Sequence, residues 1–159
     1  MRPQVDMVLK GFFGTLLLQV IPSMSAGYWT DALSVMGLAL HMAAQECERA
    51  ADVRATDNAE MRSLLAEAAD KVSDAALATR LHEGARHYET SLRISDLDQS
   101  NDVLKALLTD LHAYLKEQTG ARAAELERKI LTHLKLSAER RLIVHPLAAY
   151  AVPTVQGAA

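Results

Sequence analysis

The spacing of aliphatic residues predicts an all-α protein, a single up-and-down bundle of five to six helices forming one domain over residues 1–159. Proline occurs only at positions 3, 22, 146 and 153, so the stretch 23–145 lacks the residue that most often breaks helices. Apolar residues recur there at intervals of three and four, and the period of two typical of strands is missing. Half of all residues are hydrophobic and 23% are charged, which indicates a folded chain and excludes wholesale disorder.

The first predicted helix covers residues 5–21. Its apolar stripe consists of Leu9, Phe13, Leu16 and Val20. A basic start, an apolar run and small residues after it also have the outline of a secretory signal, but Asp6 and Gln19 interrupt that pattern. The run is also shorter than the roughly 20 residues that span a bilayer. We therefore expect a core helix that Pro22 ends, no membrane partner and a cytoplasmic protein.

The predicted helix over residues 28–54 has the largest apolar surface in the chain. Its main face consists of Trp29, Leu33, Met36, Leu40, Ala43, Cys47 and Ala50. A second apolar row beside this face leaves only a narrow polar strip. Because a helix that is apolar around most of its circumference is normally covered by other elements, we expect this one to lie innermost in the bundle. The lone cysteine, Cys47, is then expected to be buried as a small hydrophobe.

The next segment begins at Asp57, which we interpret as a helix N-cap because Glu60 follows three residues later, as in a capping box. Helical spacing continues from there to Leu92, and whether residues 57–92 form one helix or two stays open. The polar stretch 91–101 predicts a loop.

Two further helices are predicted over residues 104–115 and 121–144. The inward face of the second is expected to hold Leu126, Ile130, Leu134 and Ala138. Two prolines near the C-terminal end favour an extended apolar tail from about residue 146.

The six histidines do not form a pattern typical of metal sites. None has an acid three residues before it, which excludes the Glu-x-x-His pairs of di-iron bundles. His82 and His87 are five residues apart, whereas the zinc protease motif needs four. We therefore predict no catalytic residue, no metal and no cofactor. The net charge of −3 also excludes a strongly basic chain, so no nucleic-acid partner is expected.

Five residues are candidates for ligand binding. His41, Gln45 and Glu48 form the polar strip of the 28–54 helix, and this strip faces either a pocket or solvent. Glu83 and His87 are four residues apart on a predicted helix and form either a solvated pair or an acid/base pair.

The N-terminal third resembles a known group of sequences. The run Leu16-Leu17-Leu18-Gln19-Val20-Ile21-Pro22, the step Gly27-Tyr28 and the apolar run 32–40 are similar to the opening of a group of α-helical bacterial proteins of unknown function. Their genes neighbour those of aminoglycoside-phosphotransferase-like kinases and acyl-CoA dehydrogenases. The resemblance implies a helical fold and an accessory role in acyl-CoA or kinase-associated metabolism, and it assigns no functional residue.

These observations lead to two hypotheses about function. The first is a small helical binding or accessory protein that forms a homodimer, because one bundle of this size leaves apolar helix faces uncovered. The second is a cofactor-free enzyme, or a binder of a small apolar ligand, that uses His41 as the polar group of a bundle pocket.

Overall fold

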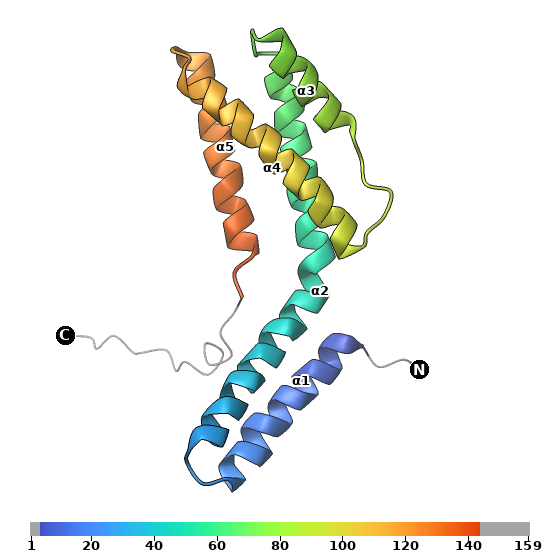
Figure 1. The fold of residues 1–159 in the computed structure, drawn as a ribbon, viewed down its shortest axis with the longest axis vertical. Coiled ribbons are helices and arrows are strands. Elements are labelled where there is room, and N and C mark those ends of the chain that lie inside the picture. The colour runs from blue at the N-terminus through green and yellow to red at the C-terminus, as the bar shows by residue number, and fades with distance from the viewer. Residues whose placement is uncertain (1–3, 144–159) are drawn as a thin grey trace, which may run out of the picture. The chain divides into compact units, whose positions relative to one another are not determined.

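The computed structural model describes residues 4–143, and the fold is all-α, with five α-helices and no strand among those residues. Helix α1 spans Val5–Thr15 and continues through a π-helical turn, η1 (Leu16–Val20), and a 3-10 turn, η2 (Ile21–Ser23). The other helices are α2 (Tyr28–Ala69), α3 (Ala75–Arg86), α4 (Ile94–Lys116) and α5 (Ala121–Arg140) (Figure 1). The all-α prediction is confirmed, and the predicted tail from residue 146 lies outside the described residues.

The packing of the chain divides into two compact units, and α2 runs through both. The first, the N-terminal hairpin, comprises the described residues 4–49. The second, the C-terminal unit, comprises Ala50–Leu142. One domain over residues 1–159 stays a prediction.

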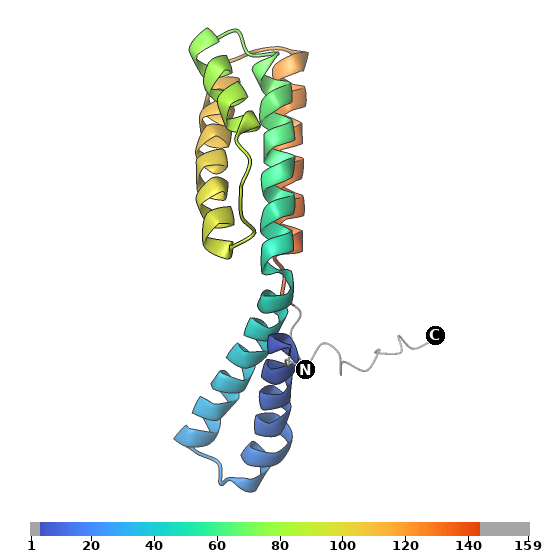
Figure 2. The same cartoon turned by 90° about the vertical axis from the view of Figure 1, so that its right-hand side faces the viewer.

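In the N-terminal hairpin, α1 lies antiparallel to the first part of α2 (Figures 1 and 2). The Phe13 ring lies 5.0 Å from that of His41 between centroids, and Lys10 Nζ lies 3.6 Å from Glu48 Oε2. Gly37 is buried, and a Cβ there would lie 3.6 Å from the Phe13 ring, which is an ordinary van der Waals contact. Pro22 stands in the turn that ends the first arm, as the sequence predicts.

The expectation that the two arms of the hairpin form the core is wrong. Helix α1 contains no buried residue, although it is rich in apolar side chains. On α2, Trp29 is 70% exposed and Met36 is 57% exposed, and Cys47 is exposed as well. Residues that the spacing places on one face therefore do share a face, but among residues 4–143 little covers it.

One helical stretch, Val5–Ser23, is long and apolar enough to cross a membrane when judged by length and composition alone. None of the residues in its apolar window is buried. The apolar surface of this helical stretch is therefore exposed to solvent in the described part of the chain.

The C-terminal unit holds the hydrophobic core. Its buried members come from the second part of α2 and from α3, α4 and α5, and they are Met61, Leu64, Leu65, Ala68, Ala69, Leu77, Leu81, Ala85, Leu104, Leu107, Leu108, Leu111, Leu115, Leu126 and Ile130. The set is almost entirely leucine and alanine, in line with the low aromatic content of 4%. Alternate spacings of three and four bring these side chains onto one face of each helix.

The boundaries in this unit differ from the predicted ones. Residues 57–92 form two helices, because α2 ends at Ala69 and Asp74 caps α3 by accepting hydrogen bonds from the backbone N–H groups of Ala76 and Leu77. Asp57 is not an N-cap, since it lies inside α2. The predicted loop over 91–101 is also wrong, because α4 already begins at Ile94.

Candidate functional site between α2 and α5

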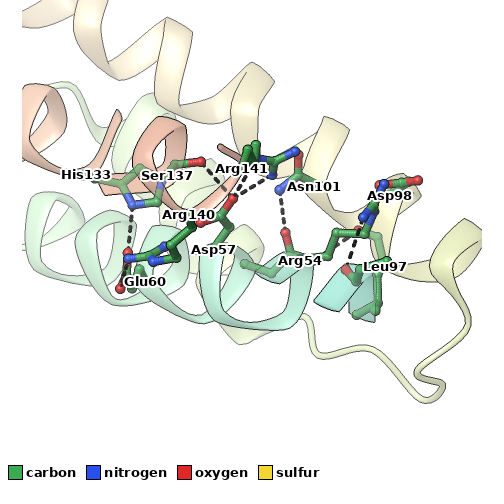
Figure 3. Close-up of polar contacts among 12 residues, drawn as sticks. Arg54, Asp57, Glu60, Leu97, Asp98, Asn101, His133, Ser137, Arg140 and Arg141 are labelled. Atoms are coloured by element: carbon green, nitrogen blue, oxygen red, sulfur yellow. Dashed lines mark hydrogen bonds and ion pairs between the residues drawn. The ribbon is translucent and has the colours of Figure 1, made fainter. Parts of the chain in front are cut away.

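A cluster of charged residues joins the middle of α2 to the C-terminal end of α5 (Figure 3). Asp57 is only 1% exposed, and Ser137 Oγ donates a hydrogen bond of 2.7 Å to its Oδ2. Arg141 Nη2 donates a second bond to the same oxygen at 2.5 Å, and Arg140 Nη1 donates to Oδ1. A buried carboxylate is thus paired with two guanidinium groups and accepts a further hydrogen bond from a hydroxyl.

Glu60 lies one helical turn after Asp57 and extends this cluster. Arg140 bridges the two acids, because its Nη2 donates to Glu60 Oε1. The other Glu60 oxygen lies 3.1 Å from Nδ1 of His133, which is 7% exposed. The carboxylate therefore fixes the imidazole in place, as carboxylates do for histidines in many binding and catalytic sites.

The contacts of these acids lower their pKa values. Burial raises the pKa of Asp57, but the hydrogen bonds from Ser137, Arg141 and Arg140 outweigh it, so the pKa lies below the ordinary 3.8. The hydrogen bond from Arg140 holds the pKa of Glu60 below the ordinary 4.5, against some burial and with help from His133. Both side chains are charged at neutral pH.

A second polar network lies on another side of α2, in the C-terminal unit. Asn58 is buried, and its Nδ2 donates to the Leu97 carbonyl oxygen at 3.0 Å and to Glu89 Oε1 at 2.6 Å. Asn101 Nδ2 donates to Asn58 Oδ1 at 2.7 Å. Arg62, which is also buried, lies 2.6 Å from the same Glu89 oxygen. Each amide finds a partner, which is how a core tolerates buried polar side chains.

A groove of about 680 Å³ runs between α2 and α5 beside the charged cluster. It is lined by Glu60, Ser63, Leu64, Glu67, Glu125, Arg128, Lys129, Thr132, His133 and Leu136. The α2 members are spaced by three, one and three residues, and the α5 members follow the same helical pattern, so each helix presents one face to the groove. Sites for small molecules usually have about 300–1,000 Å³, and this groove falls in that range.

The candidate residues chosen from the sequence lie elsewhere. His41 is half-buried against Phe13, and its Nε2 lies 2.8 Å from Gln45 Nε2. Glu48 is exposed and lies near Lys10. The polar strip of these three residues thus runs along the α1 side of α2, where two of its members contact α1, rather than along a wholly solvated face.

Glu83 and His87 do not form the predicted pair. Both side chains are exposed, and no ion pair joins them in the described part of the chain. Helix α3 ends at Arg86, so His87 is its C-cap, and the His87 carbonyl oxygen accepts a hydrogen bond from Arg62 Nε at 2.6 Å. His87 therefore contacts Arg62 through its backbone carbonyl and not through its imidazole.

The groove and its cluster were missed because their parts are far apart in the sequence. Residues 57–67 and 125–141 are each an ordinary amphipathic helix with charged residues. The signal that could have found them is the spacing of Asp57 and Glu60, because acids three residues apart share a helix face. That spacing is also the capping-box pattern, and sequence alone does not separate the two interpretations.

Comparisons with protein-family models, with curated proteins and with solved structures give no significant match to this chain.

Proposed function

We propose that the protein is a small helical binding or accessory protein that acts as a homodimer, with the N-terminal hairpin as the dimer interface. The observation that carries this proposal is the lack of charge on the exposed side of the hairpin. Between residues 11 and 45 the only charged residue is Asp31. Exposed apolar patches of this kind mark interaction sites in soluble proteins.

The α2 arm presents a regular apolar surface. We define the hairpin face as its large exposed apolar side chains, Val5, Met7, Val8, Phe12, Leu18, Met24, Tyr28, Trp29, Val35, Met36 and Met42. On α2, Trp29 and Met36 are seven residues apart, and so are Val35 and Met42. Such repeats keep side chains on one line of a helix, as in helices that pack against a partner helix.

The α1 arm adds to this surface from the other side of the hairpin. Val5, Val8 and Phe12 are spaced by three and four residues and share a face of α1, and Phe12 is 57% exposed. The side of α1 that carries Phe13 packs against α2 instead. Because both arms leave apolar residues exposed, two hairpins that pack together form a four-helix arrangement that covers them.

A second copy of the chain fits this face better than a lipid bilayer does. The stretch Val5–Ser23 meets the length and hydropathy of a membrane span, but its α1 part packs beside the part of α2 that carries His41, Gln45 and Glu48. A bilayer that took up α1 would have to desolvate those side chains or separate the two arms, and either is costly. A two-fold axis instead brings against itself a face whose one charged residue between positions 11 and 45 is Asp31, one helical turn before Val35.

The test is a charge placed on the hairpin face. Met36→Glu introduces a carboxylate at a position that solvent reaches in a single chain, so the monomer should fold as before. In a dimer the new charges are buried, and the chain should dissociate. The readouts are the molar mass by light scattering and the emission of Trp29, the single tryptophan, which should move to longer wavelength when the face is uncovered.

Ser34→Glu is the matched control. It adds the same charge to the same helix at an exposed position whose hydroxyl donates to the Thr30 carbonyl oxygen. This variant should keep the dimer mass and the Trp29 emission of the unaltered chain. If both variants have the same mass as the unaltered protein, the hairpin face is not the interface. Flotation of the unaltered chain with lipid vesicles would instead identify the membrane as its partner.

The biological setting stays a proposal from the resemblance of residues 16–40, namely an accessory role in acyl-CoA or kinase-associated metabolism in the cytoplasm. The rival hypothesis is a cofactor-free enzyme or apolar-ligand binder that uses His41. The contacts of His41 with Phe13 and Gln45 favour a packing role for this side chain over that rival.

A further inference from the structure

The groove between α2 and α5 has the composition of a small-molecule site. Leu64 and Leu136 give it apolar walls, and Ser63 and Thr132 add hydroxyl groups. His133, which is 7% exposed, is a buried titratable side chain at the groove wall and is held there by Glu60. An apolar groove with a few convergent polar groups is the usual form of a ligand site.

The acidic residues of the groove are already paired with basic residues of the same unit. Arg140 and His133 contact Glu60, while Lys71 and Lys129 both contact Glu67. The hydrogen bonds from Lys129 and Lys71 hold the pKa of Glu67 below its ordinary value, so this carboxylate is ionised and paired.

Glu125 is paired too, because its Oε1 lies 3.2 Å from Lys129 Nζ. Arg128 differs from these residues. Its side chain lines the groove and is exposed, and its guanidinium makes no ion pair with any residue between positions 4 and 143. The charge that the groove offers to a ligand is therefore positive, and it comes from Arg128.

We propose that this groove binds a small amphipathic anion, with the anionic head on Arg128 and the apolar body along Leu64 and Leu136. Arg128, Thr132 and Leu136 are successive members of one face of α5. From Arg128 to Leu136 the helix rises by about 12 Å, which sets the length of an extended alkyl chain that reaches both. A guanidinium binds a carboxylate or a phosphate in the same forked geometry, so the head can be either.

Three ten-carbon probes test the proposal, namely decanoate, decyl phosphate and decyltrimethylammonium, each titrated calorimetrically below the concentration at which it forms micelles. The two anions should bind with a stoichiometry of one per chain, and the better of them identifies the head group. The cation should bind weaker by on the order of tenfold or more. Equal binding of the cation, or no binding of either anion, would overturn the proposal.

Arg128→Gln should weaken binding of the anions by on the order of tenfold and leave the cation unchanged. Leu136→Gln should weaken all three probes, since it makes the apolar wall polar. Arg86→Gln is the control, because Arg86 is an exposed arginine in the last turn of α3 and does not line this groove. If Arg86→Gln and Arg128→Gln have the same effect, the anions bind by general charge attraction and the site does not exist.

The hairpin face could adsorb the same probes, and Met36→Glu separates the two surfaces. This variant should alter the molar mass but not the one-to-one binding of decanoate. Arg128→Gln should do the reverse. The groove proposal and the dimer proposal can thus be refuted independently. If decanoate binding is lost in Met36→Glu but kept in Arg128→Gln, the probe binds to the hairpin face and the groove proposal is wrong.

Discussion

Arg141 Nη2 donates a hydrogen bond of 2.5 Å to the buried Oδ2 of Asp57, although 84 residues separate the two in sequence. The contact fixes the C-terminal end of α5 to the middle of α2, next to the groove between these helices. Figure 3 shows Arg140 and Ser137 converging on the same carboxylate. Asp57 therefore helps to hold the two groove walls together, beside the contacts of Glu60 with Arg140 and His133.

Asp57→Ala should destabilise the protein by about 2 kcal/mol, because it removes the acceptor of four hydrogen bonds at a buried position. The estimate is below that for a fully buried pair, since Arg140 and Arg141 are partly exposed and can be hydrated. Urea unfolding measures the loss. Asp98→Ala is the control, because the Asp98 carboxylate is 49% exposed in its pair with Arg54 and should contribute less than about 1 kcal/mol.

Stability should fall in acid. The pKa values of Asp57, Glu60 and Glu89 lie below the ordinary 3.8 and 4.5, so the unfolded chain takes up protons at a higher pH than the native chain. Their contribution is complete above about pH 4.5 and is lost as the pH drops through the lower native pKa values. Melting temperatures measured from about pH 6 down to about pH 2.5 should decrease most at the acid end.

Asp57→Asn tests whether the ionisation of Asp57 contributes to the pH dependence of stability. The amide cannot titrate, so the variant should be less stable than the parent near neutral pH, and its melting temperature should depend less steeply on pH in acid. A variant curve parallel to that of the parent throughout would show that Asp57 does not contribute to the acid transition.

Gly84 of α3 packs directly against Leu107 of α4. A Cβ added there would lie 2.2 Å from Leu107 Cδ1, and Leu107 is buried, so its side chain would have to move within a packed core. Gly84→Ala should therefore cost about 1–2 kcal/mol, although alanine favours a helix over glycine by roughly 1 kcal/mol. Urea unfolding of both proteins gives the difference.

Leu107→Val provides the matched background, because valine lacks the Cδ1 methyl group that the new Cβ would meet. In that background Gly84→Ala should be neutral or stabilising, and the double-mutant cycle should give a coupling of about 1 kcal/mol or more. Equal effects in the two backgrounds would contradict the steric account.

The sequence was sufficient for the all-α class, because helical spacing is a local signal, but not for where α2 ends or α4 begins. Periodic leucines predict α4 and α5, and Leu126 and Ile130 are buried as expected. His133 is buried as well, whereas Leu134, which was expected to face inward, is 47% exposed. The buried face of α5 therefore includes His133, whose Nδ1 lies 3.1 Å from Oε2 of Glu60 on α2, a residue 73 positions away in the sequence.

Long-range polar contacts also explain the misplaced loop. The stretch 91–101 is rich in residues that favour turns, yet Asn101 lies in α4 and is 4% exposed, because it donates to Asn58 of α2. An amide that satisfies a buried partner behaves as a core residue, and composition cannot reveal that partner. The capping box at Asp57 was misinterpreted for the same reason, because the partners of this carboxylate lie about 80 residues later, on α5.

The error about the N-terminal hairpin is of another kind. The spacing of Trp29 and Met36 correctly places them on one face, but an apolar face predicts only that something covers it. In the described part of the chain little does, and we propose that a second copy covers it.

The most direct test of this account is the molar mass of the unaltered chain, measured by sedimentation velocity over a dilution series. A single chain has a mass of 17.4 kDa. We predict a species of twice that mass that dissociates to 17.4 kDa on dilution, with Trp29 emission moving to longer wavelength in parallel. A mass of 17.4 kDa at every concentration, with unchanged emission, would contradict the proposed dimer.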